Sequence, residues 1–224
     1  MKRLPLARLT SPLIAFACVV IVVAVVVGQE GDHLAYLPFV PRAGTSGTTR
    51  VSIASDGTEG NYFSYAPSIS ADGRFVAFDS FANNLVSNDT NNAWDVFVHD
   101  QDTGQTTRVS IASDGTQGNS YSYGPSISAD GRFVAFYSFA NNLVSNDTSA
   151  VPDIFVHDRD TAQTTRVSIA SDGTEGNDDS YWPSISADGR FVAFLSSANN
   201  LVSDDTNGVD DIFVHDRGEQ LSPR

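Results

Sequence analysis

The chain has 224 residues, of which 27 are acidic and 13 are basic, so its formal net charge is −14. This charge argues against nucleic acid and anionic lipid surfaces as partners, because both require clustered lysine and arginine. A single cysteine rules out a disulfide framework and a cysteine-based zinc site. The acids are 23 aspartates and four glutamates. Because aspartate favours turns and glutamate favours helices, the composition predicts a turn-rich protein with few helices.

Residues 1–28 have the pattern of an export segment. Three basic residues near the start precede an unbroken apolar run at 13–27. As a helix, this run would span about 22 Å at ~1.5 Å per residue, short of the ~30 Å hydrocarbon core of a bilayer. A cleaved signal peptide and an N-terminal membrane anchor at 11–28 both fit. Either one predicts export to the periplasm, the cell surface or the extracellular space, with membrane contact through this segment alone.

A repeat of 58 residues follows a glycine- and proline-containing linker at 29–47. The twelve residues 67–78 recur at 125–136 and at 183–194, and the first two units are identical at 46 of 58 positions. The predicted boundaries are a half unit at 48–66, units at about 67–124, 125–182 and 183–217, and a tail at 218–224.

Each repeat predicts four short strands joined by turns. In the first unit, an Asp-Gly turn at 72–73 separates two strands rich in branched and aromatic residues. No stretch after the N-terminal run has helical periodicity. Repeated four-stranded units of this kind are typical of β-propeller blades. The four strands of the first unit are expected at 67–70, 74–80, 95–100 and 106–111.

One motif in the repeat has a specific resemblance. Residues 70–78 read Ser-Ala-Asp-Gly-Arg-Phe-Val-Ala-Phe, and residues 95–100 read Asp-Val-Phe-Val-His-Asp. Together they resemble the PD40 (WD40-like) repeat of TolB-type β-propellers, over 48–217. One departure recurs, because alanine stands at 71 and its two equivalents where the family prefers proline. The resemblance implies an all-β fold of three four-stranded blades. It says little about function, because such propellers serve as envelope scaffolds, binding modules and peptidase gates.

The number of blades presents a difficulty. Closed propellers have about four to eight blades, and three are too few. Residues 48–53 predict a fourth strand with no blade before it, and no fourth strand is expected after 211–216. Three interpretations stay open. Two copies form a six-bladed ring head to tail, or the chain is a truncated copy of a longer propeller, or it acts as an arc of three blades.

The loop before each third strand is a candidate calcium site. Calcium takes six to eight oxygen ligands, which aspartate and asparagine supply. The alternative is that these side chains stabilise turns through hydrogen bonds to their own backbone. No loop has the spacing of an EF-hand, and no other cofactor is indicated. The candidate ligands are Asp89, Asn91 and Asp95 in the first unit, Asp147 and Asp153 in the second, and Asp205, Asn207 and Asp211 in the third.

Histidine and arginine recur at fixed positions of the repeat. His99, His157 and His215 are each followed by aspartate. A Ser-His-Asp triad would need three groups that converge at one place, whereas these histidines recur in every unit without a nucleophile motif. We therefore expect them to make structural hydrogen bonds to a neighbouring aspartate or a backbone carbonyl. The arginines are expected to form ion pairs with blade aspartates.

Aromatic residues cluster in the segment before each first strand. On one rim of a propeller, such side chains stack on sugars or peptides, or they cover the blade core. The chain is therefore predicted to be an exported, non-enzymatic module that binds a protein or a polysaccharide. The alternative is a truncated or accessory propeller of a peptidase-type or other larger system, without independent activity. The candidate binding residues are Tyr62, Tyr65, Tyr121, Tyr123, Tyr181 and Trp182.

Overall fold

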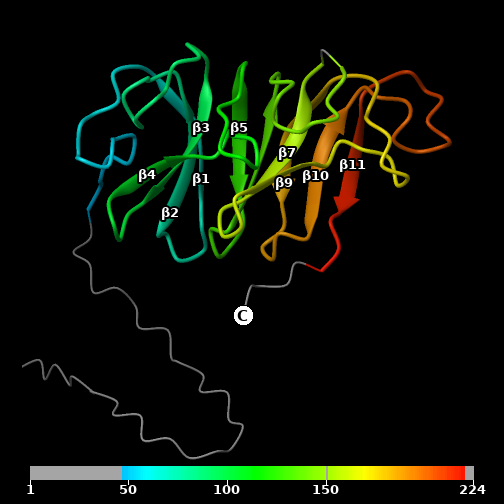
Figure 1. The fold of residues 1–224 in the computed structure, drawn as a ribbon. Helices are drawn as coiled ribbons and strands as arrows, with labels where there is room; N and C mark the ends of the chain where they lie inside the picture. Colours follow the sequence, from blue (N-terminus) through cyan, green and yellow to red (C-terminus); the bar gives the residue numbers. More distant parts are fainter. Residues whose placement is uncertain (1–46, 150, 220–224) are drawn as a thin grey trace, which may run out of the picture. The chain divides into compact units, whose positions relative to one another are not determined.

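The computed structural model describes residues 47–149 and 151–219, which fold into three antiparallel β-sheets (Figure 1). Each sheet corresponds to one repeat and is called a blade here. Blade 1 contains β1 (Ser64–Ile69), β2 (Phe75–Ser80), β3 (Asp95–Asp100) and β4 (Gln105–Arg108). Blade 2 contains β5 (Ser122–Ile127), β6 (Phe133–Ser138), β7 (Asp153–Asp158) and β8 (Gln163–Arg166). Blade 3 contains β9 (Ser180–Ile185), β10 (Phe191–Ser196) and β11 (Asp211–Asp216).

The strands of each blade pair in sequence order, as in a meander. The predicted all-β architecture of repeated blades is confirmed. Blades 1 and 2 have the predicted four strands, and blade 3 has three within the described residues, where no fourth strand was expected after 211–216. The strand predicted at 48–53 is also absent, and its residue Ile53 makes an isolated bridge to Glu59. The reason is local, because β4 and β8 pair with the third strand of their own blade, whereas no such strand precedes 47–50 within the described residues.

The first strand of each blade begins earlier than predicted. β1 begins at Ser64 and passes Pro67 through an irregularity in its pairing with β2, between Tyr65 and Ser68. The residue before the proline has a positive φ of 48° at Ala66, and its equivalents in β5 and β9 have the same property. This bulge lets the strand accommodate a proline, which cannot donate to the ladder. The third strand, by contrast, has the predicted bounds 95–100.

Apolar side chains from neighbouring blades form the core. Val96 and Val98 of blade 1 pack with Phe136 and Leu143 of blade 2. The same positions of blade 2 pack against blade 3. Backbone hydrogen bonds add to this packing, because Ala71 N donates to Ala129 O at 2.9 Å, in the next blade. Blade 2 therefore packs against blade 1 with one face and against blade 3 with the other.

The predicted N-terminal helix at 1–28 lies outside the described residues, and so does the predicted linker up to residue 46. Of the predicted tail at 218–224, residues 220–224 also lie outside them. Among the residues that the structure describes, there is no helix long and apolar enough to cross a membrane.

Candidate functional site

A row of aromatic rings crosses all three blades. It lies near the edge of each sheet where the first strand begins and the second strand ends. Consecutive ring centroids in the row are 4.9 to 6.2 Å apart. We call this set the aromatic row, and its members in order are Tyr62, Phe63, Tyr65, Trp94, Tyr123, Tyr137, Tyr181 and Trp182.

The structure brings all six predicted binding residues together at this row. Tyr121 lies beside it, with its ring centroid 6.1 Å from that of Tyr123. The prediction that these aromatics lie in loops before the first strands is wrong for the tyrosines at 65, 123 and 181 and for Trp182, which lie within β1, β5 and β9. They belong to the strands because each first strand begins before its proline.

Sequence reasoning missed Tyr137, which joins the rings of blade 2 to those of blade 3. Its centroid is 5.6 Å from that of Tyr123 and 5.2 Å from that of Tyr181. A signal was present, because position 137 is one of the few that differ between repeats, with Asp79 and Leu195 as its equivalents. A position that differs between nearly identical repeats indicates that the side chain there has different neighbours in each blade.

The centre of the row has unusual electrostatics. Burial raises the pKa of Tyr123 to about 12, with further contributions from Tyr137, Tyr121 and the charge of Asp79. Asp79 is buried and accepts a hydrogen bond of 2.9 Å from Gly124 N. Burial raises its pKa above the usual range, while this hydrogen bond opposes the shift. The centre of the row thus combines a buried carboxyl group with protonated phenols.

The ends of the row are open to solvent. Trp182 is the most exposed member, with 69% of its surface accessible, and it lies in β9 with a φ of 53°. A bulky residue at positive φ is uncommon and costs backbone energy. Tyr62, Phe63 and Tyr65 form the exposed end on blade 1. Solvent-accessible aromatic rings in contact with one another form a surface suited to flat or apolar groups of a partner.

The calcium candidates of blade 1 surround an arginine. Arg108 Nη1 lies 3.3 Å from Asp89 Oδ1 and 3.2 Å from Asp95 Oδ2. Asn91 donates its side-chain N–H to Asp95 Oδ2 at 3.0 Å. Burial raises the pKa of Asp89 to about 6, with the charge of Asp95 acting in the same direction and Arg108 opposing it. The guanidinium supplies the positive charge here, which favours an ion-pair cluster over a calcium site.

Blade 2 repeats this cluster with one addition. Arg166 Nη1 lies 3.7 Å from Asp147 Oδ1 and 3.2 Å from Asp153 Oδ2, and it also contacts Glu175. Burial raises the pKa of Asp147 to about 6, again with the neighbouring carboxylates acting in the same direction. Glu175 was not predicted, because it lies in a different loop, 22 positions after Asp153 in the sequence.

Blade 3 has the carboxylates of this cluster without the arginine. Asn207 donates to Asp211 Oδ2 at 2.8 Å, as Asn91 does to Asp95. Within the described range, no arginine forms an ion pair with Asp205 or Asp211. The residue equivalent to Arg108 and Arg166 is Arg224, which lies outside the described residues.

The repeated histidines have structural surroundings in the first two blades. His99 Nδ1 is 2.8 Å from Thr106 Oγ1, and His157 Nδ1 is 2.9 Å from Thr164 Oγ1. The predicted structural role is supported, but the partner is a threonine of the fourth strand rather than an aspartate or a carbonyl. Burial lowers the pKa of His157 to about 4. The predicted arginine ion pairs are confirmed, for example between Arg132 and Asp158 at 2.7 Å.

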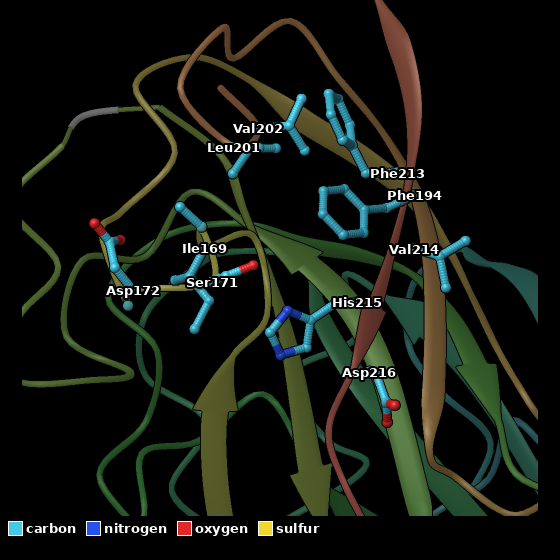
Figure 2. A pocket seen from close by; sticks show the side chains of 12 residues that line it. Ile169, Ser171, Asp172, Phe194, Leu201, Val202, Phe213, Val214, His215 and Asp216 are labelled. Carbon is cyan, nitrogen blue, oxygen red and sulfur yellow. The ribbon is translucent and has the colours of Figure 1, made fainter. Parts of the chain in front are cut away.

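A groove of about 590 Å³ lies beside the equivalent histidine of blade 3, His215 (Figure 2). Figure 2 shows the imidazole of His215 between β11 and the segment that contains Ile169 and Ser171. Phe194, Leu201 and Phe213 close one end of the groove.

Comparison with known proteins identifies similar structures but no family. No family model matches the chain, and no curated protein matches it significantly. A protein assigned as TolB from Agrobacterium tumefaciens is 20% identical, with a TM-score of 0.46, over 71% of this chain and 48% of that structure. TolB from Acinetobacter baumannii is 21% identical, with a TM-score of 0.41, over 70% and 30%. The tricorn protease is 20% identical, with a TM-score of 0.40, over 70% and 13%.

This chain therefore spans about half of the first matched structure and less than a third of the other two. TolB structures are among the matches, as the repeat motif predicts, and a protease is among them too. The propeller-type architecture rests on the repeated antiparallel sheets of this chain itself.

Proposed function

We propose that this chain is a non-catalytic binding module that holds a protein or a polysaccharide against the aromatic row. The observation that carries the proposal is the continuity of the row across three blades, with exposed rings at Tyr65 and Trp182. Tyrosine and tryptophan supply large contact areas with little loss of side-chain entropy, and they dominate the energetics of many interfaces. A row open to solvent suits an extended chain better than a small molecule.

The surroundings of the histidines support a non-catalytic role. His99 and His157 are buried, and each is held by a threonine of its own blade. A catalytic histidine must instead reach the proton that it transfers. The placement of this module outside the cytoplasm is part of the proposal, and it rests on the basic and apolar pattern of residues 1–28.

Substitution of Trp182 tests the proposal. The full chain is screened against soluble polysaccharides and extracellular proteins, and the affinity of each hit is measured by calorimetry. Trp182→Ala is expected to weaken binding about tenfold or more, equivalent to ~1.4 kcal/mol. Trp182→Phe keeps a ring at this position and serves as the matched control, with most of the affinity retained. Unchanged affinity in Trp182→Ala and Tyr65→Ala would refute the role of the row, and turnover of a bound polymer would refute the non-catalytic role.

A further inference from the structure

The groove beside His215 occupies the place that a fourth strand fills in the other blades. In blade 2, β8 pairs with β7, with Thr164 opposite His157 and Arg166 opposite Phe155. The equivalent residues of β11, His215 and Phe213, line the groove instead. Among the described residues, no strand pairs with the outer edge of β11, so its backbone groups are available to another extended segment.

Contacts in blades 1 and 2 define what this groove would bind. Thr164 N donates to Ser113 Oγ at 2.9 Å, and Thr164 Oγ1 donates to Ile111 O at 2.6 Å. Blade 1 repeats both contacts, from Thr106 to Ser55 and Ile53. The equivalent acceptors of blade 3 are Ser171 and Ile169, which line the groove. A segment that filled the groove in the same way would be extended and would have a threonine at this position.

One segment of the chain has the required sequence and no strand partner. β4 and β8 both read Gln-Thr-Thr-Arg, and residues 47–50 read Gly-Thr-Thr-Arg, followed by the same Val-Ser-Ile. In the structure, 47–50 are exposed and lie outside any sheet. We propose that residues 47–50 of a second copy of this chain bind along β11 as the fourth strand of blade 3, so that two copies join head to tail. The pairing would place Thr48 opposite His215 and Arg50 opposite Phe213.

Charge complementarity supports this occupant. In blades 1 and 2, the arginine of the fourth strand lies between two buried aspartates, as Arg166 does between Asp147 and Asp153. Asp205 and Asp211 are the equivalent pair of blade 3. Arg50 is the equivalent arginine, and in this chain it pairs with Glu59 on the surface. A second copy would bring Arg50 to this aspartate pair.

The outer faces of the first and last blades support a whole second copy rather than a lone peptide. The ring of Phe75 in blade 1 packs on Gly131 of blade 2, where a Cβ atom would come within 2.1 Å of it. Phe191 is the equivalent ring of blade 3 and is 39% exposed, whereas Phe133 in blade 2 is 1% exposed. Gly73 is the equivalent glycine of blade 1, and a Cβ atom there would meet nothing closer than 3.9 Å. These two surfaces match each other.

The chain's own residues 221–224 are the competing occupant, because they stand 58 positions after β8. They read Leu-Ser-Pro-Arg, and Pro223 has no backbone N–H to donate. They would also leave Phe191, Ile212 and Val214 uncovered, because blade 3 itself covers the equivalent face of blade 2. A second copy would fill the groove and would also cover the exposed face of blade 3.

A charge exchange tests the proposal. The full-length wild-type chain is expected to have the mass of a dimer by light scattering at micromolar concentration. Arg50→Asp and Asp211→Arg should each be monomeric alone, because each places like charges in the groove. When the two variants are mixed, both interfaces again join opposite charges, and dimers should return. A monomeric wild type would overturn the proposal, and so would a mixture that stays monomeric.

Gly73→Ala provides a second variant that leaves the groove intact. The added Cβ meets nothing closer than 3.9 Å within the chain, so the variant is expected to fold, with a loss of stability from the positive φ of 74° at this position. It is expected to lose the dimer, because the methyl group blocks the site for Phe191 of the second copy. A dimer that survives this change would overturn the proposed packing of the two outer faces. Circular dichroism of each variant shows that the fold is retained.

Discussion

Strands β7 and β11 have the same sequence, Asp-Ile-Phe-Val-His-Asp, and different surroundings. All six residues of β7 are buried, because β8 lies along one edge and blade 3 covers one face. In β11, exposed and partly buried residues alternate, and Ile212 is 70% exposed. Six identical residues therefore form either a core strand or an edge strand. The difference lies in the segments that pack beside each strand, and not in the strand itself.

The ion pairs of these two blades make the same point. Arg132 with Asp158, and Arg190 with Asp216, both have an Nη2–Oδ2 distance of 2.7 Å. The side chains of the first pair are 8% and 10% exposed, and those of the second are 40% and 44% exposed. The local geometry is repeated, while the protection from water is not. Because water screens the exposed pair, equal geometry implies unequal contributions to stability.

The largest expected difference between β7 and β11 is in the loss of unfolding free energy when a buried or an exposed isoleucine is truncated. Ile154→Ala should lower the free energy of unfolding by about 4 kcal/mol, because Ile154 is fully buried between blades 2 and 3. Ile212→Ala, at the same position of β11, should have little effect on the monomer. Urea denaturation at concentrations low enough to keep the chain monomeric provides the measurement. Equal losses in the two variants would show that β11 is covered in the monomer.

The second largest difference is expected between the contributions of the two ion pairs to the free energy of unfolding. Arg132→Met leaves Asp158 buried without its partner, and it is expected to cost about 3 kcal/mol of unfolding free energy. Arg190→Met removes the same contact from an exposed site and should change the urea midpoint little. Added salt should affect the second pair more than the first. A large loss in Arg190→Met would contradict the view that water screens this pair.

A smaller, pH-dependent difference is expected at the histidines. Burial lowers the pKa of His157 to about 4, below its ordinary value of 6.5. Between these values the unfolded chain binds the extra proton, so this group's contribution to stability is present above pH 6.5 and is lost as the pH falls toward 4. His157→Gln should therefore flatten the stability profile between pH 6.5 and 4.

The difference between wild type and variant isolates this effect. Asp89 and Asp147, whose pKa values are raised to about 6, act with the opposite sign, because their contribution falls as the pH rises from 3.8 through 6. They are unchanged in the variant and cancel in the comparison. His215→Gln serves as the matched control, with a smaller effect because His215 is less buried. Identical pH profiles for wild type and His157→Gln would contradict the assignment.

Several features of the site were accessible from sequence, and others were not. Repetition of Asp-Gly turns and of Asp-x-Phe-Val-His-Asp predicted the blades and the bounds of β3. The start of β1 was missed, because a proline was read as the first residue of the strand, whereas a bulge before Pro67 accommodates it. The six aromatic candidates all lie at the aromatic row or beside it, whereas Tyr137 was missed. Its place in the row depends on contact between two blades, which no local pattern encodes.

The sequence by itself determined the all-β class, the period of 58 residues and the strand order within each blade, because hairpin pairing is set by local turns and alternation. Only the tertiary structure decided which copies of a repeated segment are buried, which aspartates face an arginine, and which rings touch. These outcomes depend on what lies beside each blade, and identical residues cannot encode different neighbours. For that reason Asp153–Asp158 forms a core strand and Asp211–Asp216 an open edge.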